Sequence, residues 1–172
     1  DPGDTTFDTS PLFVGTNVAL TYNSVSLPAK SFSIDINNNF EDDDFRLGSF
    51  FLGDLTAKRR EITATFNIRE VSSALWRQAT YGTAAATVPG GLTTKQALVI
   101  TCTSYEAIPL STPSTTKYEI KLTMPKFILE PYALSISGDD IIDDDISGRA
   151  VRPDPLTAAL TVTVRTDTAA AF

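Results

Sequence analysis

Hydrophobic and polar residues alternate along two segments of the first half of the chain, residues 30–39 and 61–70. A repeat of two is typical of β-strands that bury one face and expose the other. Both segments are therefore predicted to be strands. Their apolar members are Phe32, Ile34, Ile36, Ile62, Ala64, Phe66 and Ile68.

Further stretches with the same alternation predict additional strands. These lie at residues 17–22, 25–27, 96–105, 117–124 and 159–165, with extended segments at 127–129 and 134–136. Asn23 and Ser24 predict a tight turn between the first two of them. Pro125 is expected to end or edge the strand before it, because proline lacks a backbone N–H. In the last strand Leu160, Val162 and Val164 are expected to point inward.

One segment, residues 71–82, has the spacing of a short helix instead. Ser72 is expected to be its N-cap and Gly82 its stop. Trp76 is expected to anchor the helix against the sheet. The residues with helical spacing are Val71, Ala74, Leu75 and Gln78.

Seven or eight strands without helices between them cannot build a parallel sheet. The predicted fold is therefore mainly β, an antiparallel β-sandwich or barrel with one flanking α-helix. Its domain is expected to span residues 17–166, between an N-terminal arm (1–16) and a C-terminal tail (167–172). Many strands also leave edges that need covering, which favours assembly through sheet edges.

The segment between the two clearest strands, residues 40–57, carries four phenylalanines and five acidic residues. It is too long for a hairpin turn and too apolar for a solvated loop, so we expect it to contact a partner surface. The basic run Lys58, Arg59 and Arg60 follows it, and is expected to pair either with acids of an adjacent copy or locally. The residues expected at an inter-subunit or inter-ring contact are Phe40, Glu41, Asp42, Asp43, Asp44, Phe45, Arg46, Leu47, Phe50, Phe51 and Leu52.

The amino-acid composition argues against several classes of function. The 172 residues carry a net charge of -7, which argues against nonspecific binding to nucleic-acid phosphates. Histidine is absent, and no catalytic or cofactor-binding motif is present, so neither an enzyme nor a cofactor is expected. The single cysteine, Cys102, is in phase with Leu98 and Ile100 and is expected to be a small buried hydrophobe. No apolar run is long enough for a membrane helix, and no signal peptide is visible.

Two aspartate-rich runs, residues 41–44 and 139–145, offer oxygen ligands for a cation such as calcium. Neither has the spacing of an EF-hand loop. Three interpretations stay open: plain solvated acidity, a binding module for calcium or carbohydrate, and a negative field built up by identical subunits around a ring.

The succession of motifs resembles a known family. LPAKSFSIDINNN is followed by an acidic and aromatic loop with LGS, by KRREITATF, by a helix with LW and YGT, by YEIKLTMPKFIL and by LTVTV. This order, over residues 17–165, resembles the tail tube proteins of long-tailed bacteriophages. It is most similar to the second of two domains in the subfamily whose tube domain is duplicated.

The resemblance implies a structural virion protein with no membrane contact, assembled in the bacterial cytoplasm. Six tube domains would form a ring around a closed inner β-barrel, and stacked rings would deliver DNA through a negative lumen. The lumen would hold the tape measure protein and DNA without specific binding, with other tail proteins at the tube ends. The long loop, through Phe45, Leu47, Phe50, Phe51 and Leu52, would reach a neighbouring subunit or ring.

A sister domain upstream of Asp1 is not in the sequence, so rings of six chains and of three duplicated chains both stay open, as does a longer parent protein. The tube protein of a contractile injection system is an alternative with the same fold.

Overall fold

The computed structural model describes residues 13–40, 58–69, 73–88, 90, 94–108, 115–133 and 143–166, except the side chain of Val14. These ranges contain eight strands and one helix, in agreement with the predicted mainly β fold. The elements are β1 (Phe13–Tyr22), β2 (Val25–Leu27), β3 (Ala29–Asn37), β4 (Glu61–Arg69), α1 (Ala74–Tyr81), β5 (Gln96–Ala107), β6 (Lys117–Leu129), β7 (Asp143–Ala150) and β8 (Thr161–Arg165).

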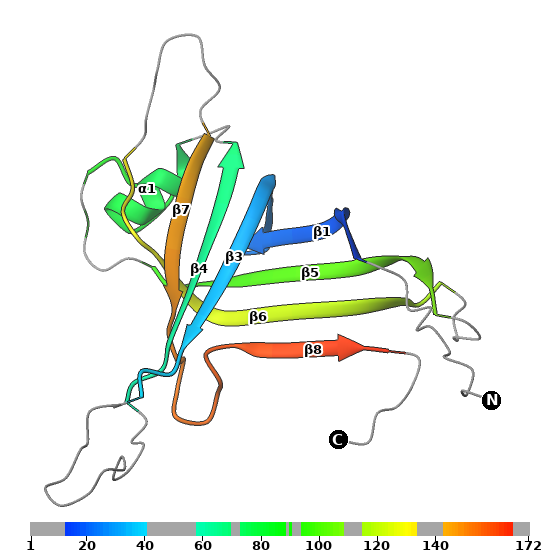
Figure 1. Cartoon of the computed structure of the whole chain (residues 1–172). Coiled ribbons are helices and arrows are strands. Elements are labelled where there is room, and N and C mark those ends of the chain that lie inside the picture. Colours follow the sequence, from blue (N-terminus) through cyan, green and yellow to red (C-terminus); the bar gives the residue numbers. More distant parts are fainter. Residues whose placement is uncertain are drawn as a thin grey trace, which may run out of the picture.

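All strand pairs are antiparallel, and β6 belongs to two layers. Its first part, Glu119–Thr123, pairs with β8, while its last part, Phe127–Leu129, pairs with β7. We call β2-β1-β5-β6-β8 the first sheet and β6-β7-β4-β3 the second sheet. Figure 1 shows the long strands of the two sheets crossing at a steep angle. This is the orthogonal sandwich, in which a strand changes sheet at a corner.

The core lies where the apolar sides of the two sheets face each other. The strand register places Leu20, Ile100 and Leu122 side by side on one face of the first sheet. Their counterparts on the second sheet come from β4 and β7, and α1 adds Ala79. The buried members are Leu20, Tyr22, Ala64, Phe66, Ile68, Ala79, Leu98, Ile100, Met124, Phe127, Leu129 and Ile146.

The predicted tight turn between β1 and β2 is confirmed. Asn23 and Ser24 both have positive φ angles, 52° and 63°. Two central residues with φ above zero define a type I′ turn, whose twist matches that of the flanking strands. β1 itself begins at Phe13, inside the segment that the sequence predicts as an arm.

Helix α1 ends as predicted but begins later. Gly82 adopts the left-handed conformation, with φ 91°, and its N–H donates to the carbonyl of Gln78. The prediction of Ser72 as N-cap is wrong, because the N-cap position is Ser73, whose side chain makes no capping hydrogen bond. Trp76 Nε1 donates to the Tyr132 carbonyl at 3.1 Å, just beyond β6. No helix among the described residues is long and apolar enough to span a membrane.

Two features of the strands differ from the prediction. β6 does not end at Pro125 but continues to Leu129. Pro125 lies after the residues paired with β8 and before those paired with β7, where the register with β5 also shifts. A proline is tolerated at such an irregularity because no regular ladder bond is lost.

The second difference concerns the aspartate run 139–145, whose last three residues begin strand β7 (Asp143–Ala150), a strand that was not predicted. β7 pairs with β4 along its length. Its buried side carries Asp144, Ile146 and Gly148, which is not a hydrophobic alternation. The predicted segment 134–136 lies outside the described residues.

Candidate subunit interface

The first sheet has two open edges. β8 pairs with β6 on one side, and no described strand pairs with its other side. At the opposite end of the sheet, β2 covers Leu20–Tyr22 of β1, so on the side away from β5 residues 13–19 have no partner strand among the described residues. Open edges present rows of N–H and C=O groups that can pair with another chain.

The directions of the strands determine whether the two open edges can pair with each other in neighbouring copies. β1, β5, β6 and β8 alternate in direction, so β8 runs antiparallel to β1. A copy placed with its β1 against β8 would therefore continue the antiparallel alternation. The second sheet differs, because in the described chain only its β3 edge is open while its other end is β6 itself. Only the first sheet can be extended at both ends.

An apolar seam opens between β8 and β3, the outermost strands of the two sheets. Val162 and Val164 pair with Leu122 and Ile120, so they point toward the core side as predicted. They are nevertheless 53% and 59% exposed. Across the seam, Ile36 of β3 is 51% exposed, although it points to the same interior. Apolar side chains that face inward yet stay in water indicate a surface that another molecule covers.

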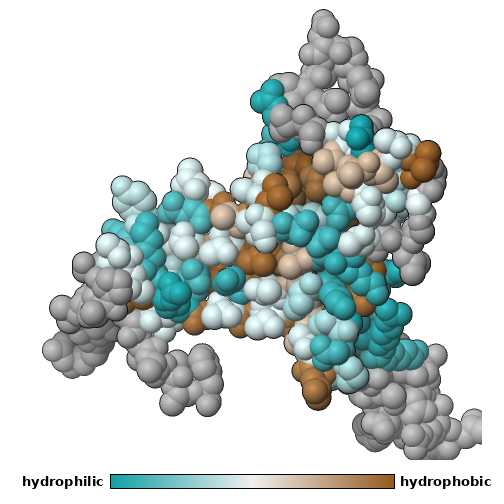
Figure 2. Space-filling model, turned by 180° about the vertical axis from the view of Figure 1, so that it is seen from behind, coloured by the Kyte–Doolittle hydropathy of each residue, from teal (hydrophilic) through white to brown (hydrophobic). Residues whose placement is uncertain are grey.

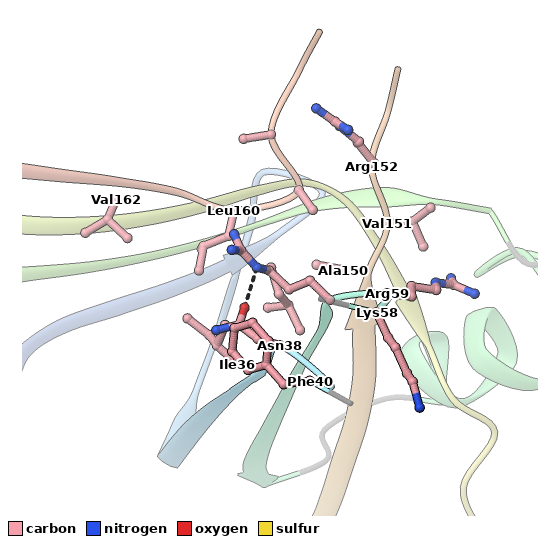
Figure 3. Close-up of a pocket in the computed structure, with 14 residues that line it drawn as sticks. Ile36, Asn38, Phe40, Lys58, Arg59, Ala150, Val151, Arg152, Leu160 and Val162 are labelled. Atoms are coloured by element: carbon pink, nitrogen blue, oxygen red, sulfur yellow. Dashed lines mark hydrogen bonds between the residues drawn. The ribbon is translucent and has the colours of Figure 1, made fainter. Parts of the chain in front are cut away.

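A groove of about 650 Å³ continues this seam toward the loop between β7 and β8. We call it the basic groove, because the described residues that line it include four cations and no acidic residue. Figure 3 shows the charged ends of Lys58, Arg59 and Arg152 pointing away from one another. The groove is therefore an apolar floor with separate cations at its rim, not a pocket for one small anion. Its lining residues are Ile36, Asn38, Phe40, Lys58, Arg59, Arg60, Ile62, Ala150, Val151, Arg152, Ala158, Ala159, Leu160 and Val162.

Asparagines hold the two ends of the segment 41–57 together at this groove. The Lys58 N–H donates to the Asn39 carbonyl at 3.0 Å, and Asn39 Nδ2 donates to the Arg59 carbonyl at 2.9 Å. Arg60 Nε donates to Asn38 Oδ1 at 2.7 Å, the bond drawn in Figure 3. Asn39 has a φ of 46°, a conformation that asparagine tolerates better than most residues.

The structure thus brings together the described members of the predicted contact, Phe40 and the basic run Lys58–Arg60. The other predicted members, residues 41–52, lie outside the described residues.

The loop between β7 and β8 supplies one wall of the basic groove, which was not predicted from the sequence. Asp154 accepts hydrogen bonds from the Leu156 N–H, the Thr157 N–H and the Thr157 hydroxyl, at 2.7 to 2.8 Å. The Thr157 hydroxyl is the first cause that lowers the pKa of the Asp154 carboxyl. Arg152 Nε donates to the Thr157 carbonyl. The sequence contains a turn signal that could have located this loop. Asp154 lies between two prolines and is followed three residues later by a threonine.

The aspartates of β7 do not converge on one site. Asp143 forms an ion pair with Lys30, and Asp145 accepts from Asn67 Nδ2 at 2.9 Å. Asp144 lies between them on the opposite, buried side of the strand. Among the described residues no group of three or more carboxylate, thiol or imidazole side chains could hold a metal ion. Residues 41–44 and 139–142 lie outside the described ranges.

Cys102 is half-buried and packs against the core, and burial raises the pKa of its thiol.

The comparison with known proteins agrees with this architecture. No curated protein matches the chain at a significant level. A protein-family model described as "Phage tail tube protein" matches residues 1–150. Since that match covers most of the 172 residues, the chain belongs to the phage tail tube protein family and is a structural component of a phage tail.

Proposed function

We propose that copies of this chain join head to tail into rings, and that stacked rings form the tube through which phage DNA is delivered to the host. The observation that supports this most directly is the pair of open edges, β1 and β8, at the two ends of one sheet. An interface between two different surfaces of the same chain closes into a ring when the rotation between copies allows it. The role is structural and non-enzymatic.

The positions of the open edges favour a closed barrel. Through the register, Thr163 of β8 lies level with Ala19 of β1, across Lys121 and Thr101. The part of β1 that β2 leaves open, however, runs back from Ala19 to Phe13. Joining the two edges therefore shifts the register from one copy to the next. Such a stagger is what tilts the strands of a closed β-barrel.

The width of such a barrel suits a channel. Each copy contributes four strands, β1, β5, β6 and β8. With six tube domains in a ring, as the family resemblance implies, the barrel has more strands than porins of roughly 16–18 strands, which already hold an aqueous channel. We propose this ring for the present chain, as six chains or as three chains with a duplicated domain.

We further propose that the acidic segment of a neighbouring copy docks in the basic groove. Residues 41–57 contain five acidic residues and one arginine, and several large apolar side chains. The groove offers the complement, with four cations above an apolar floor. Both ends of the segment are fixed at Asn39 and Lys58, so its tip can extend roughly 25–30 Å, half the length of an extended chain of that size. That reach is sufficient for a contact with the next subunit or ring.

In the assembled virion, we propose that the tube holds the tape measure protein and DNA, with DNA not bound specifically, and that other tail proteins lie at its ends. Assembly takes place in the bacterial cytoplasm.

The test is direct imaging of the purified protein. Electron microscopy should show rings or tubes, and sedimentation velocity should show a concentration-dependent large species. A protein that stays monomeric at millimolar concentration, in low and moderate salt, would overturn the proposal.

A further inference from the structure

The loop between β7 and β8, residues 151–160, carries an apolar side chain that is almost wholly exposed. Leu156 is 97% exposed, more than any other large hydrophobic residue of the described chain. Its backbone is fixed, because the N–H groups of Leu156 and Thr157 both donate to Asp154 at 2.8 Å. Figure 1 shows this loop projecting past β8 on the side away from β6. An exposed leucine on a fixed backbone can act as an anchor, since little conformational freedom is lost when it binds.

A second hollow, of about 270 Å³, lies at the other end of the first sheet. We call it the hairpin pocket, because β1 and β2 form one wall, while the end of β4 and helix α1 form the others. Figure 2 shows hydrophobic side chains gathered around α1 in the view from behind. Drug-sized ligands occupy pockets of roughly 300–1,000 Å³, so the hairpin pocket is suited to a single side chain. Its apolar lining includes Val25, Leu27, Ile68, Ala74, Leu75 and Ala84.

The chemistry of the hairpin pocket matches that of the loop. Gln78 Nε2 donates to the Tyr22 hydroxyl at 3.3 Å, so these two buried side chains are already paired and an apolar side chain can enter beside them. The described lining contains one cation, the exposed Arg69, and no acidic residue. Leu156 follows the exposed Asp154 by two residues. The loop therefore offers an apolar anchor beside a negative charge, and the pocket offers an apolar cavity beside a positive one.

The strand register brings the loop and the pocket together in the proposed ring. On the open edge of β1, β2 occupies Leu20–Tyr22, which leaves residues 13–19 for β8 of the neighbouring copy. β2 and β8 both run antiparallel to β1, so the neighbour's β8 would begin where β2 ends. Thr161, the first residue of β8, would then lie beside Leu27, the last residue of β2. The loop that leads into Thr161 comes from the second sheet, so it would approach on the side of β2 where the hairpin pocket lies.

We infer that Leu156 of one copy inserts into the hairpin pocket of the neighbouring copy in the same ring. The inference rests on the proposed head-to-tail ring and identifies a second contact within it, beside the joined strand edges. Leu156 is too far from the pocket of its own copy, because β2 and β8 are the two ends of a five-stranded sheet, roughly 19 Å apart at about 4.8 Å per strand. In the neighbouring copy Arg69 would lie near Asp154, which adds a charge pair beside the apolar contact.

Disulfide cross-linking tests this contact. In a Cys102→Ala background, Leu156→Cys combined with Val25→Cys places one thiol on the loop and one at the pocket, where Val25 is 61% exposed. Assembled rings treated with a mild oxidant should form disulfides between neighbouring copies, since a disulfide needs Cα atoms within roughly 7 Å of each other. The control combines Leu156→Cys with Ser33→Cys, which is exposed on the outer face of β3, and should not cross-link.

On a denaturing gel the products of the double variant should form a ladder that stops at the number of chains in one ring. A ladder that continues to longer species would place the contact between stacked rings and overturn the inference. Cross-linking no stronger than that of the control pair would overturn it too. Electron microscopy of the parent protein shows separately whether rings form at all, so a failure of the proposed ring is distinguished from a failure of this contact.

A second measurement does not depend on thiols. Leu156→Asp should stay folded as an isolated subunit, because the side chain is 97% exposed. By sedimentation velocity, the protein concentration needed for ring assembly should rise at least tenfold, since a carboxylate replaces an apolar anchor. Leu156→Met, which keeps an apolar side chain of similar volume, should assemble like the parent protein. Assembly of Leu156→Asp at the parent concentration would overturn the inference while leaving the proposed ring in place.

Discussion

Gly148 of β7 lies against the ring of Phe127 at the corner where β6 passes from one sheet to the other. A Cβ atom at position 148 would come within 2.4 Å of Phe127 Cε1 and within 2.4 Å of the Ile128 carbonyl oxygen. Neither neighbour can move away freely, because one is a buried ring and the other is backbone. The close approach of β7 to β6, and hence the joining of the two sheets, therefore requires glycine here.

We predict that Gly148→Ala lowers the free energy of unfolding by about 2–3 kcal/mol or more, since overpacking of this kind forces backbone shifts. Urea unfolding followed by circular dichroism measures the change. The matched control is Gly15→Ala in β1, where an added Cβ meets nothing within 4 Å. An equal loss of stability in both variants would show that the contact with Phe127 is not the cause.

The second prediction concerns the apolar seam. Replacing Val162 and Val164 by aspartate should abolish rings and tubes, because a carboxylate on the edge strand opposes burial against a neighbouring copy. The isolated subunit should stay folded, since both side chains are more than half exposed. Electron microscopy and thermal unfolding check the two parts separately.

The control for this prediction is Val88→Asp, a substitution of the same kind at a residue that is 67% exposed and lies outside the seam. Rings that persist in the double variant, or are lost equally with Val88→Asp, would count against an interface at β8.

The third prediction concerns the basic groove. Arg152→Glu should raise the protein concentration needed for assembly about fivefold, which corresponds to roughly 1 kcal/mol for a surface charge pair. Added salt should weaken assembly of the parent protein by screening the same contacts. Sedimentation velocity over a range of protein concentrations measures both effects.

Two further variants test whether the partner is the acidic segment. Asp42→Lys combined with Arg152→Glu should restore part of the lost assembly, because the exchanged charges again attract. Lys95→Glu, a charge reversal at an exposed residue outside the groove lining, serves as the control. No recovery in the double variant would argue for another occupant of the groove.

The fourth prediction concerns the buried residue Tyr22. Its burial raises the pKa of the phenol to about 12. The unfolded state releases the phenol proton near pH 10, while the folded state holds it until about pH 12. Its stabilisation is therefore fully present below pH 10 and is lost as the pH rises to 12, by on the order of 2–3 kcal/mol.

Measured unfolding free energies between pH 9 and 12 should show this slope, and Tyr22→Phe should reduce it. The same variant should lower stability at neutral pH by about 1 kcal/mol, because Gln78 Nε2 loses its hydrogen bond to the Tyr22 hydroxyl. An unchanged slope in Tyr22→Phe would assign the pH dependence to other groups.

Much of the fold could be predicted, because local sequence patterns determine most of its strands and its hairpin turn. The strands around Ile34 and Phe66 follow from strict alternation, and the hairpin follows from Asn23 and Ser24. β7 was not predicted, because two of its buried positions hold Asp144 and Gly148 instead of hydrophobic residues. These residues are tolerated there only through contacts with distant strands. The continuation of β6 through Pro125 depends in the same way on its change of partner.

The candidate interface could be predicted only in part, for the same reason. Phe40 and the basic run flank the acidic segment in the sequence, so their proximity follows from the chain itself. Arg152 and Leu160 reach the basic groove only because β7 and β8 pair with different parts of β6. No local sequence pattern predicts that these two residues lie in the same groove. The seam likewise becomes visible only once β3 and β8 are known to be the outer strands of their sheets.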